Sequence, residues 1–486
     1  MYEDHGISSW SRMHTDSPNS QVRDNIVGAN DAIDEIQPCT SVELNYDILL
    51  CVMARMDAKD YRVKDLLAMM FTCRSFYKSG LPILLRRPVY VDPSNIASFC
   101  NYMFKDLDWH GSLLRHLYLR HSASYRAVSW HLKRLSLIVK HASKLKTFSA
   151  STSERIFKYA PDMVETLITL PNLNELELWS MGHRAITLLR GSSRKLIQLS
   201  LSLLDGAQFH IPQLTLPRLE ELTLHDVSFR TFQARCPSVK RLALGITGID
   251  DWSLSDLVSL FPNLRELVLR RHHTIRDLGR VQFLHEVNKR DRGSIPHPWI
   301  GLEEVEGDLA NIFALAIPCS VKTLRLSETL LDQRTFNWLP TLLTGCQPKF
   351  LSLDIETSHL DLVSFANCNR LAVTAPQLSS FQIVIRICNN FDQVLNLHSF
   401  LDIVLRFISC PSLITIEIHL HADSTIRYTG HPALEALRDL GSYNFAKRVL
   451  KAVGSKSLRH ICLAITGRGS SHWIVSRNGE LIRGGR

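Results

Sequence analysis

The segment LPNLNELELWSM, residues 170–181, carries the pattern that decides the fold. Its leucines stand at Leu173, Leu176 and Leu178, separated first by two residues and then by one. The alternation of the last two leucines with polar residues is typical of a short strand with one buried face. Pro171 stands two residues before the first leucine, where it ends a helix and starts the turn into the strand.

The same pattern recurs along most of the chain. Clear copies begin at Leu114, Leu173, Leu196, Leu219, Val239, Leu264 and Val321, and weaker copies at Leu378, Leu413 and Leu458. From residue 173 to residue 264 the copies start 20 to 25 residues apart, which is the spacing of leucine-rich repeats. Chance explains one such strand but not ten in register. The sequence therefore predicts an α/β solenoid of parallel strands with helical or irregular return segments.

The array resembles leucine-rich repeats with one departure. Those repeats carry Asn or Cys after the third leucine, and here these positions hold Met181, Leu204, Val227, Thr247, His272 and Thr329. An asparagine ladder is therefore not expected. Because later copies lie 35 to 57 residues apart, we expect an irregular horseshoe interrupted by loops.

Residues 42–90, which begin ahead of the array, contain two apolar stripes at helical spacing. The first comprises Leu49, Val52, Met53 and Met56, and the second comprises Leu66, Met70, Cys73 and Tyr77. Two short helices within about fifty residues cannot bury both faces, so part of this surface is expected to bind a partner. For Met53 and Met70 we favour packing against the first repeat instead.

This segment resembles an F-box, the short helical module that docks a ubiquitin-ligase substrate receptor onto a Skp-type adaptor and a cullin. The matching residues are Leu44, Asp47-Ile48-Leu49, Leu66-Leu67 and the ending Cys73-Arg74-x-Phe76. Asn45 replaces the usual proline, and the turn at residues 57–64 is a few residues longer. The run from Cys73 to Val89 is similar to fungal receptor families with degenerate F-boxes. The resemblance implies an adaptor-binding surface of Leu44, Asp47, Ile48, Leu49, Met56, Leu66, Leu67 and Cys73.

The chain is expected to have four regions. Residues 1–38 carry seven acidic and two basic residues and lack apolar periodicity, so we interpret them as a disordered acidic tail. Residues 39–88 form the F-box-like helical module, and residues 89–470 the solenoid, with a first strand at Val89–Val91. Residues 471–486 are predicted to form a hairpin cap, because Asn478-Gly479 favours a two-residue type I′ turn.

The basic residues, which give the chain a net charge of +9, cluster in one stretch. Residues 109–153 contain eight Lys or Arg, five His and no acid. One interpretation is a solvated helix face, whose buried side comprises Trp130, Leu135, Ile138, Ala142 and Leu145. The other is an anion-binding patch that receives an acidic or phosphorylated protein segment.

Strand alternation predicts which side chains face outward. The third, fifth and seventh places of each copy point away from the buried leucines. From these places we select His116, Tyr118, Arg120 and Trp179 as the candidate substrate-binding residues, because large outward aromatic side chains offer area that a partner can bury.

The sequence contains no recognisable catalytic, nucleotide-binding or metal-binding motif. It has no phosphate-binding glycine loop, serine elbow, paired zinc cysteines or calcium loop. We therefore expect no catalytic, cofactor-binding or metal site, and no enzyme activity. No apolar run reaches the eighteen or so residues that a membrane span needs, and a secretory signal is not expected.

These observations favour a substrate-recognition subunit of a Skp/cullin/F-box-type ubiquitin ligase in the cytoplasm or nucleus. Its repeat face would bind a protein substrate, and no membrane partner is expected. Two alternatives stay open: a leucine-rich-repeat scaffold for protein interactions with no ligase link, and a basic repeat protein that binds nucleic acid. The second is less favoured, because no nucleic-acid-binding fold or series of stacking aromatics is recognisable.

Overall fold

The computed structural model describes residues 46–55, 63–120, 129–203, 215–225, 235–246, 253–271, 278–295, 299–329, 335, 338–357, 371–388, 397–422, 432–454, 456–466 and 469–484. The predicted acidic tail lies outside these residues. The chain divides into two compact units, residues 1–195 (unit 1) and 196–486 (unit 2). The predicted helical module and the first repeats thus share unit 1.

Unit 1 begins with three helices, which we call the helical module: α1 (Tyr46–Arg55), α2 (Val63–Met70) and α3 (Arg74–Arg86). Met53 and Met70 are buried, as expected, but the contacts that the structure gives for them lie at Gly80 within the module and not in the first repeat. A Cβ added at Gly80 would lie 2.4 Å from Met70 Cγ and 2.8 Å from Met53 Cε, so all three helices pack closely at this glycine. The second predicted stripe is shared by two helices, because Cys73 caps a new helix and accepts a hydrogen bond from the Phe76 amide.

The rest of unit 1 alternates strands and helices. Its parallel strands are β1 (Pro88–Val91), β2 (His116–Leu119), β3 (Thr147–Ala150) and β4 (Glu175–Met181), paired in that order. The return segments contain α4 (Ile96–Met103), η4 (Phe104–Asp106), α5 (Leu107–Leu113), α6 (Ser129–His141), α7 (Ser153–Tyr159), α8 (Asp162–Thr169) and α9 (His183–Ser192). The first strand was predicted at Val89–Val91, and the structure confirms it.

Unit 2 continues the same construction. Its parallel strands are β5 (Gln198–Leu203), β6 (Glu221–His225), β7 (Arg241–Ile246), β8 (Glu266–Arg271), β9 (Gly301–Gly307), β10 (Ser320–Thr329), β11 (Phe350–Glu356), β12 (Ser380–Ile387), β13 (Thr415–Ala422) and β14 (His460–Ile465). Its helices include α10 (Leu254–Leu260), α11 (Leu278–Asp291), η7 (Arg292–Ser294), α12 (Leu309–Leu315), α13 (Trp338–Cys346), α15 (Leu371–Thr374), α16 (Leu397–Phe407), α18 (Pro432–Asp439) and α19 (Ser442–Val453).

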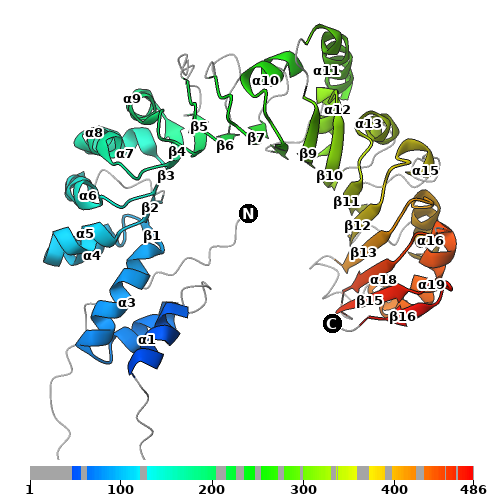
Figure 1. The fold of residues 1–486 in the computed structure, drawn as a ribbon, viewed down its shortest axis with the longest axis horizontal. Helices are drawn as coiled ribbons and strands as arrows, with labels where there is room; N and C mark the ends of the chain where they lie inside the picture. Colours follow the sequence, from blue (N-terminus) through cyan, green and yellow to red (C-terminus); the bar gives the residue numbers. More distant parts are fainter. Residues whose placement is uncertain are drawn as a thin grey trace, which may run out of the picture. The chain divides into compact units, whose positions relative to one another are not determined.

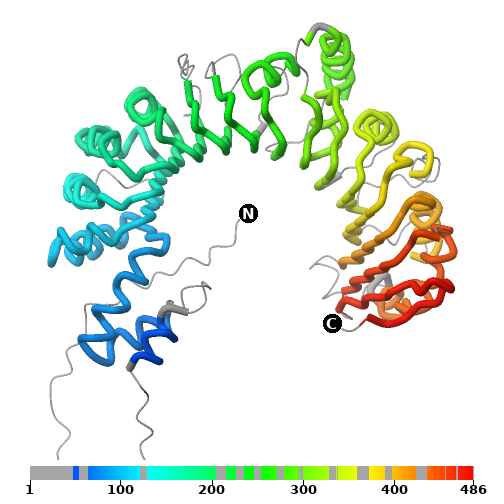
Figure 2. The backbone as a smooth tube through the Cα atoms, viewed as in Figure 1, coloured from blue at the N-terminus to red at the C-terminus, as the bar shows by residue number. Residues whose placement is uncertain are grey.

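The repeated apolar positions form the core of both units. The leucines of the best copy, Leu173, Leu176 and Leu178, are at most 2 % exposed. In Figures 1 and 2 the strands of each unit follow one another in sequence order, and the helices of the return segments lie on one side of them. The predicted α/β solenoid architecture of parallel strands with return segments is therefore confirmed at the level of each unit.

Three strands were not recognised in the sequence, because their pattern is weakened. In β3 the inward positions are Phe148 and Ala150, which pair with Leu117 and Leu119 of β2. In β9 the last inward position is Gly307, and in β11 the first leucine is replaced by Pro348. These strands occupy part of the long intervals between recognised copies.

The turns that precede the strands are joined by side-chain hydrogen bonds. At several copies the residue after the proline is Asn or Ser, and it donates to a backbone carbonyl in the turn of the preceding repeat. These bonds join Asn172 Nδ2 to Ser143 (2.8 Å), Ser238 Oγ to Pro217 (2.5 Å), Asn263 Nδ2 to Pro237 (2.8 Å) and Ser412 Oγ to Leu378 (2.7 Å). A polar link between repeats therefore exists. It lies in the turn before each strand, whereas leucine-rich repeats carry their asparagine after the strand.

Unit 2 ends in the predicted hairpin, with a different turn. Strand β15 (Gly469–Val475) pairs antiparallel with β14 and with β16 (Leu481–Arg483). Val475 lies opposite Leu481, and the Ser476 amide donates to the Glu480 carbonyl at 2.9 Å, so residues 477–479 form the turn and the predicted two-residue turn is wrong. A type I′ turn needs positive φ at both central residues, and of Asn478 and Gly479 only the glycine has it, at 80°.

Candidate functional site

The helical module exposes three large apolar side chains, Ile48, Val52 and Phe71, of which Ile48 and Val52 form a small apolar patch on α1. Ile48 and Val52 lie one turn apart on α1 and are 55 % and 40 % exposed, and Phe71 follows α2 and is 67 % exposed. Exposed large apolar side chains grouped on a short module are typical of a protein-binding surface. Phe71 was not selected from the sequence, because it lies outside both stripes.

The predicted adaptor-binding residues differ in their exposure. Asp47, Ile48 and Cys73 are exposed, and Leu49 and Leu67 are half-buried. Leu66 is fully buried on α2, which packs against α3. Its side chain therefore belongs to the core of the module, and this part of the predicted surface needs correction. Leu44 and Met56 lie outside the described residues.

The predicted outward face of β2 has the expected alternation. Leu117 and Leu119 are at most 2 % exposed, whereas His116 and Tyr118 are half-buried and Arg120 is exposed. Trp179 of β4 is also half-buried and belongs to the same face, because its Nε1 donates to Glu177 Oε1 at 2.8 Å. The four predicted substrate-binding residues therefore lie on one strand face of unit 1.

Two tyrosines and an arginine form a stack at one side of this face. The rings of Tyr90 and Tyr118 pair across β1 and β2 with centroids 5.0 Å apart. The Arg120 guanidinium carbon lies 4.2 Å from the centre of the Tyr90 ring, a cation–π contact. The positive charge of Arg120 is thus directed over Tyr90. Tyr90 was not selected from the sequence, although the register of the first strand places it beside Tyr118.

A hydrogen-bonded chain crosses three strands beside the tyrosines. Thr147 Oγ1 donates to Glu175 Oε2, and His116 Nδ1 lies 2.8 Å from the same hydroxyl. Since the hydroxyl has one proton and gives it to the carboxylate, His116 Nδ1 must be the donor to Thr147. Burial lowers the pKa of His116, an effect that Glu175 opposes and that Lys146 and Arg115 reinforce. The imidazole is therefore neutral at pH 7.

The carboxylates of β4 set the electrostatics around Tyr118. Burial, together with the neighbouring Tyr90, Glu177 and Glu175, raises the pKa of Tyr118 to about 12. Neither glutamate forms an ion pair with another residue that the structure describes. By contrast, on the strand face of unit 2, Glu304 pairs with Arg325 at 2.8 Å.

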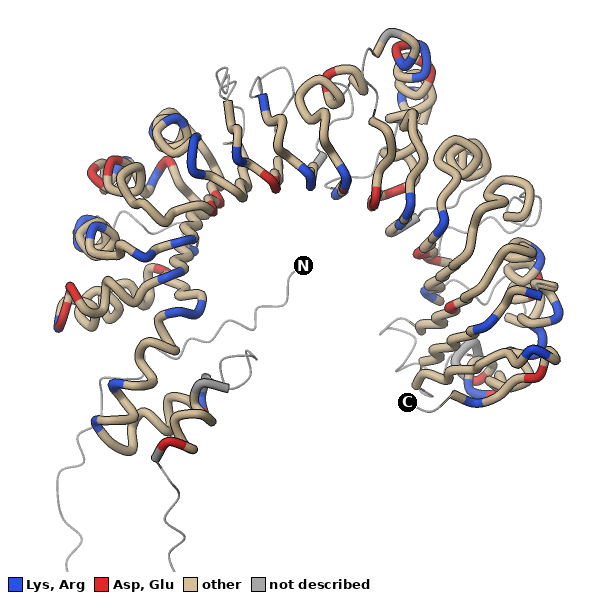
Figure 3. The backbone as a smooth tube through the Cα atoms, in the orientation of Figure 1, with Lys and Arg blue, Asp and Glu red and all other residues tan. Residues whose placement is uncertain are grey.

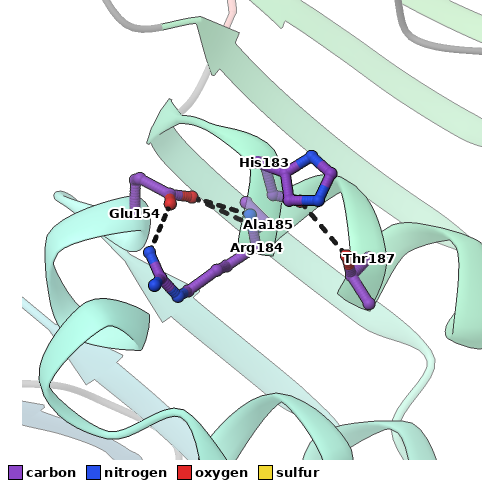
Figure 4. Close-up of polar contacts among 5 residues, drawn as sticks. All are labelled: Glu154, His183, Arg184, Ala185 and Thr187. Atoms are coloured by element: carbon purple, nitrogen blue, oxygen red, sulfur yellow. Dashed lines mark hydrogen bonds and ion pairs between the residues drawn. The ribbon is translucent and has the colours of Figure 1, made fainter.

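The end of β4 is held in place by α7. Ser153 Oγ donates to the Trp179 carbonyl at 3.0 Å. The next residue, Glu154, accepts from the Arg184 and Ala185 amides at the start of α9 and pairs with the Arg184 guanidinium at 3.1 Å (Figure 4). A carboxylate at a helix N-terminus satisfies free amides and favours the helix dipole. The Trp179 backbone is thus held by Ser153, and the start of the following helix is held by Glu154.

The basic stretch is divided between elements, as Figure 3 shows for unit 1. On α6 the predicted buried side is confirmed for Leu135 and Ile138, as it is for Ala142 and Leu145 beyond the helix, whereas Trp130 is 67 % exposed and was predicted wrongly. Arg134 stacks on Phe104 at 4.5 Å and donates to Asn101. The basic residues of α6 therefore belong to a helical return segment and do not gather around Tyr118.

In the part of the chain that the structure describes, no group of three or more His, Cys, Asp or Glu is arranged to hold a metal ion. Within the same residues, no helix is long and apolar enough to cross a membrane. The chain matches no protein-family model. It also matches no curated protein.

Proposed function

We propose that the protein is the non-catalytic substrate-recognition subunit of a Skp/cullin/F-box-type ubiquitin ligase, acting in the cytoplasm or nucleus. The helical module would dock a Skp-type adaptor and through it a cullin. The observation that carries this proposal is the exposure of Ile48 and Val52 on α1 and of Phe71 after α2, in a short helical module that precedes the repeats in sequence. Removing this area from water favours association.

The second part of the proposal is that the strand face of unit 1 holds a protein substrate. Its support is the grouping of half-buried aromatic side chains, Tyr118 and Trp179, with polar partners on one face. Such side chains dominate the energetics of protein interfaces. The receptor would act by proximity, because bridging the substrate and the ligase makes their encounter effectively intramolecular.

We expect the substitution Ile48→Asp to weaken binding to a Skp-type adaptor at least about tenfold, because it places a charge in the centre of an apolar contact. Leu137→Asp is the matched control, since Leu137 is 49 % exposed on α6, outside the module. Both variants are compared by surface plasmon resonance on the immobilised adaptor. Equal affinity of the folded Ile48→Asp variant and wild type would contradict this role for the patch. Wild-type binding too weak to detect would favour the scaffold alternative.

A further inference from the structure

We propose that the strand face of unit 1 binds an extended protein segment through a lysine or arginine side chain, held by Glu177, Glu175, Tyr118 and Trp179. This inference deepens the substrate-binding part of the proposed function and rests on it. It replaces the acidic or phosphorylated segment that the basic sequence around Tyr118 predicts.

The first argument is the unpaired negative charge. Glu175 and Glu177 are half-buried and form no ion pair with any other described residue. A half-buried carboxylate is less well solvated than an exposed one and gains more from a cation nearby. His116, which would supply a cation if protonated, is held neutral by its burial. Among the described residues, no cation is paired with these two carboxylates, so a partner's cation could pair with them.

The second argument is shape. Pairing of β2, β3 and β4 aligns Tyr118, Ser149 and Glu177 in one row across the sheet. On β3 the outward residues Thr147 and Ser149 are small and buried, and they lie between longer side chains on the two neighbouring strands. Strands are about 4.8 Å apart, so Tyr118 and Glu177 are separated by roughly twice that distance. Because Thr147 and Ser149 are already covered, a lysine or arginine would reach the half-buried carboxylates with its charged end, while its aliphatic stem lies along the neighbouring side chains.

The third argument is the identity of the flanking rings. Tyr118 and Trp179 present aromatic surface beside two carboxylates, and a cation near such rings gains from both the ring quadrupole and the opposite charge. The Trp179 indole is fixed by its hydrogen bond to Glu177 Oε1, which limits the entropy lost on binding. An anionic group at the same place would meet two carboxylates at close range.

Arg115, Lys146 and Arg120 are the cations that border this face. Arg115 Nη1 donates to the Lys144 carbonyl, and Arg120 lies over the Tyr90 ring. Arg115 and Lys146 lie at the His116 end of the strands, where both act on the imidazole. The border is therefore positive and the centre negative, an arrangement that fits a basic side chain flanked by neutral or acidic residues.

The test uses the purified full chain without adaptor and short fluorescent peptides in which serine alternates with lysine, arginine or glutamate. Fluorescence anisotropy at low ionic strength should show binding of the lysine and arginine peptides and at least about fivefold weaker binding of the glutamate peptide. Glu177→Gln should weaken lysine-peptide binding about fivefold, because it removes the charge and keeps the oxygen that accepts from Trp179. Glu165→Gln, on the exposed surface of α8, is the control for net charge and should leave binding unchanged.

Tighter binding of the glutamate peptide, or unchanged binding of the lysine peptide by Glu177→Gln, would overturn the proposal. Equal losses in Glu177→Gln and Glu165→Gln would also contradict it, since the attraction would then come from net charge alone. Because no adaptor is present, failure here leaves adaptor docking untouched. The Ile48→Asp variant, in turn, should bind the peptides as wild type does, even if it no longer binds the adaptor.

Discussion

Replacing Trp473 by alanine should lower the free energy of unfolding of unit 2 by about 3 kcal/mol, the lower end of the cost of truncating a buried tryptophan. Trp473 is 8 % exposed, lies opposite Ile461 of β14, and its ring lies 5.3 Å from that of Tyr443. The side chain therefore covers the last parallel strand, whose inward residues would otherwise meet water. Urea unfolding followed by far-UV circular dichroism measures the change.

Ile482→Ala is the control for this prediction. Ile482 lies in the same hairpin and is 54 % exposed, so its truncation should change stability by no more than about 0.5 kcal/mol. A Trp473→Ala variant as stable as wild type would show that the hairpin does not protect the end of the solenoid. We also expect this variant to aggregate more readily, because it exposes apolar area next to a strand edge.

Gly307→Ala should destabilise unit 2 by about 2 to 3 kcal/mol, through overpacking and an unfavourable backbone angle. Gly307 ends β9 with φ of +158°, and a Cβ added there would lie 2.8 Å from both the Leu269 Cβ and its carbonyl oxygen. Leu269 is its direct partner in β8, so the strands must separate. The next residue, Asp308, caps α12 by accepting from the Asn311 amide, and the shift would reach that helix.

Gly345→Ala is the matched control for Gly307→Ala, and we expect it to stabilise the protein. Gly345 lies in α13, and a Cβ there meets nothing within 4 Å. Alanine is the better helix former, so this variant should be more stable by up to about 1 kcal/mol. Thermal unfolding of both variants compares the two positions. Similar shifts for both would mean that the contact between Gly307 and Leu269 does not restrict β9.

The parallel strands were predictable wherever leucines repeat in a fixed order, because burial of alternate residues dictates both the pattern and the strand. The pattern fails at β3, β9 and β11, where Ala150, Gly307 and Pro348 occupy leucine positions. There the strand forms because the neighbouring strands offer backbone N–H and C=O groups for hydrogen bonding. This is a tertiary effect that the local sequence does not encode. The link between turns through Asn172 and Asn263 was also missed, although both follow a proline.

Exposure on the helical module was harder to predict. Periodicity places Leu49, Val52 and Leu66 on apolar faces alike, but the packing of three helices around Gly80 decides which of them face water. Trp130 shows the same limit, since its spacing suits the buried side of α6 and it is nonetheless exposed.

The charge of the candidate substrate site could not be read from a linear stretch. Residues around Tyr118 are basic in sequence, yet strand pairing brings Glu175 and Glu177 from β4 onto the same face. Side chains two strands apart are separated by many residues in the chain. Only the register of the sheet joins them.

The central claim is tested most directly by titrating the purified full chain with a purified Skp-type adaptor in a calorimeter. We predict a one-to-one complex with a Kd of about 1 µM or tighter, equivalent to about 8 kcal/mol of binding free energy. We also predict a negative heat-capacity change, because apolar surface is buried on binding. No measurable heat at adaptor concentrations up to about 100 µM, at two temperatures and with the chain shown to be folded, would contradict the receptor function.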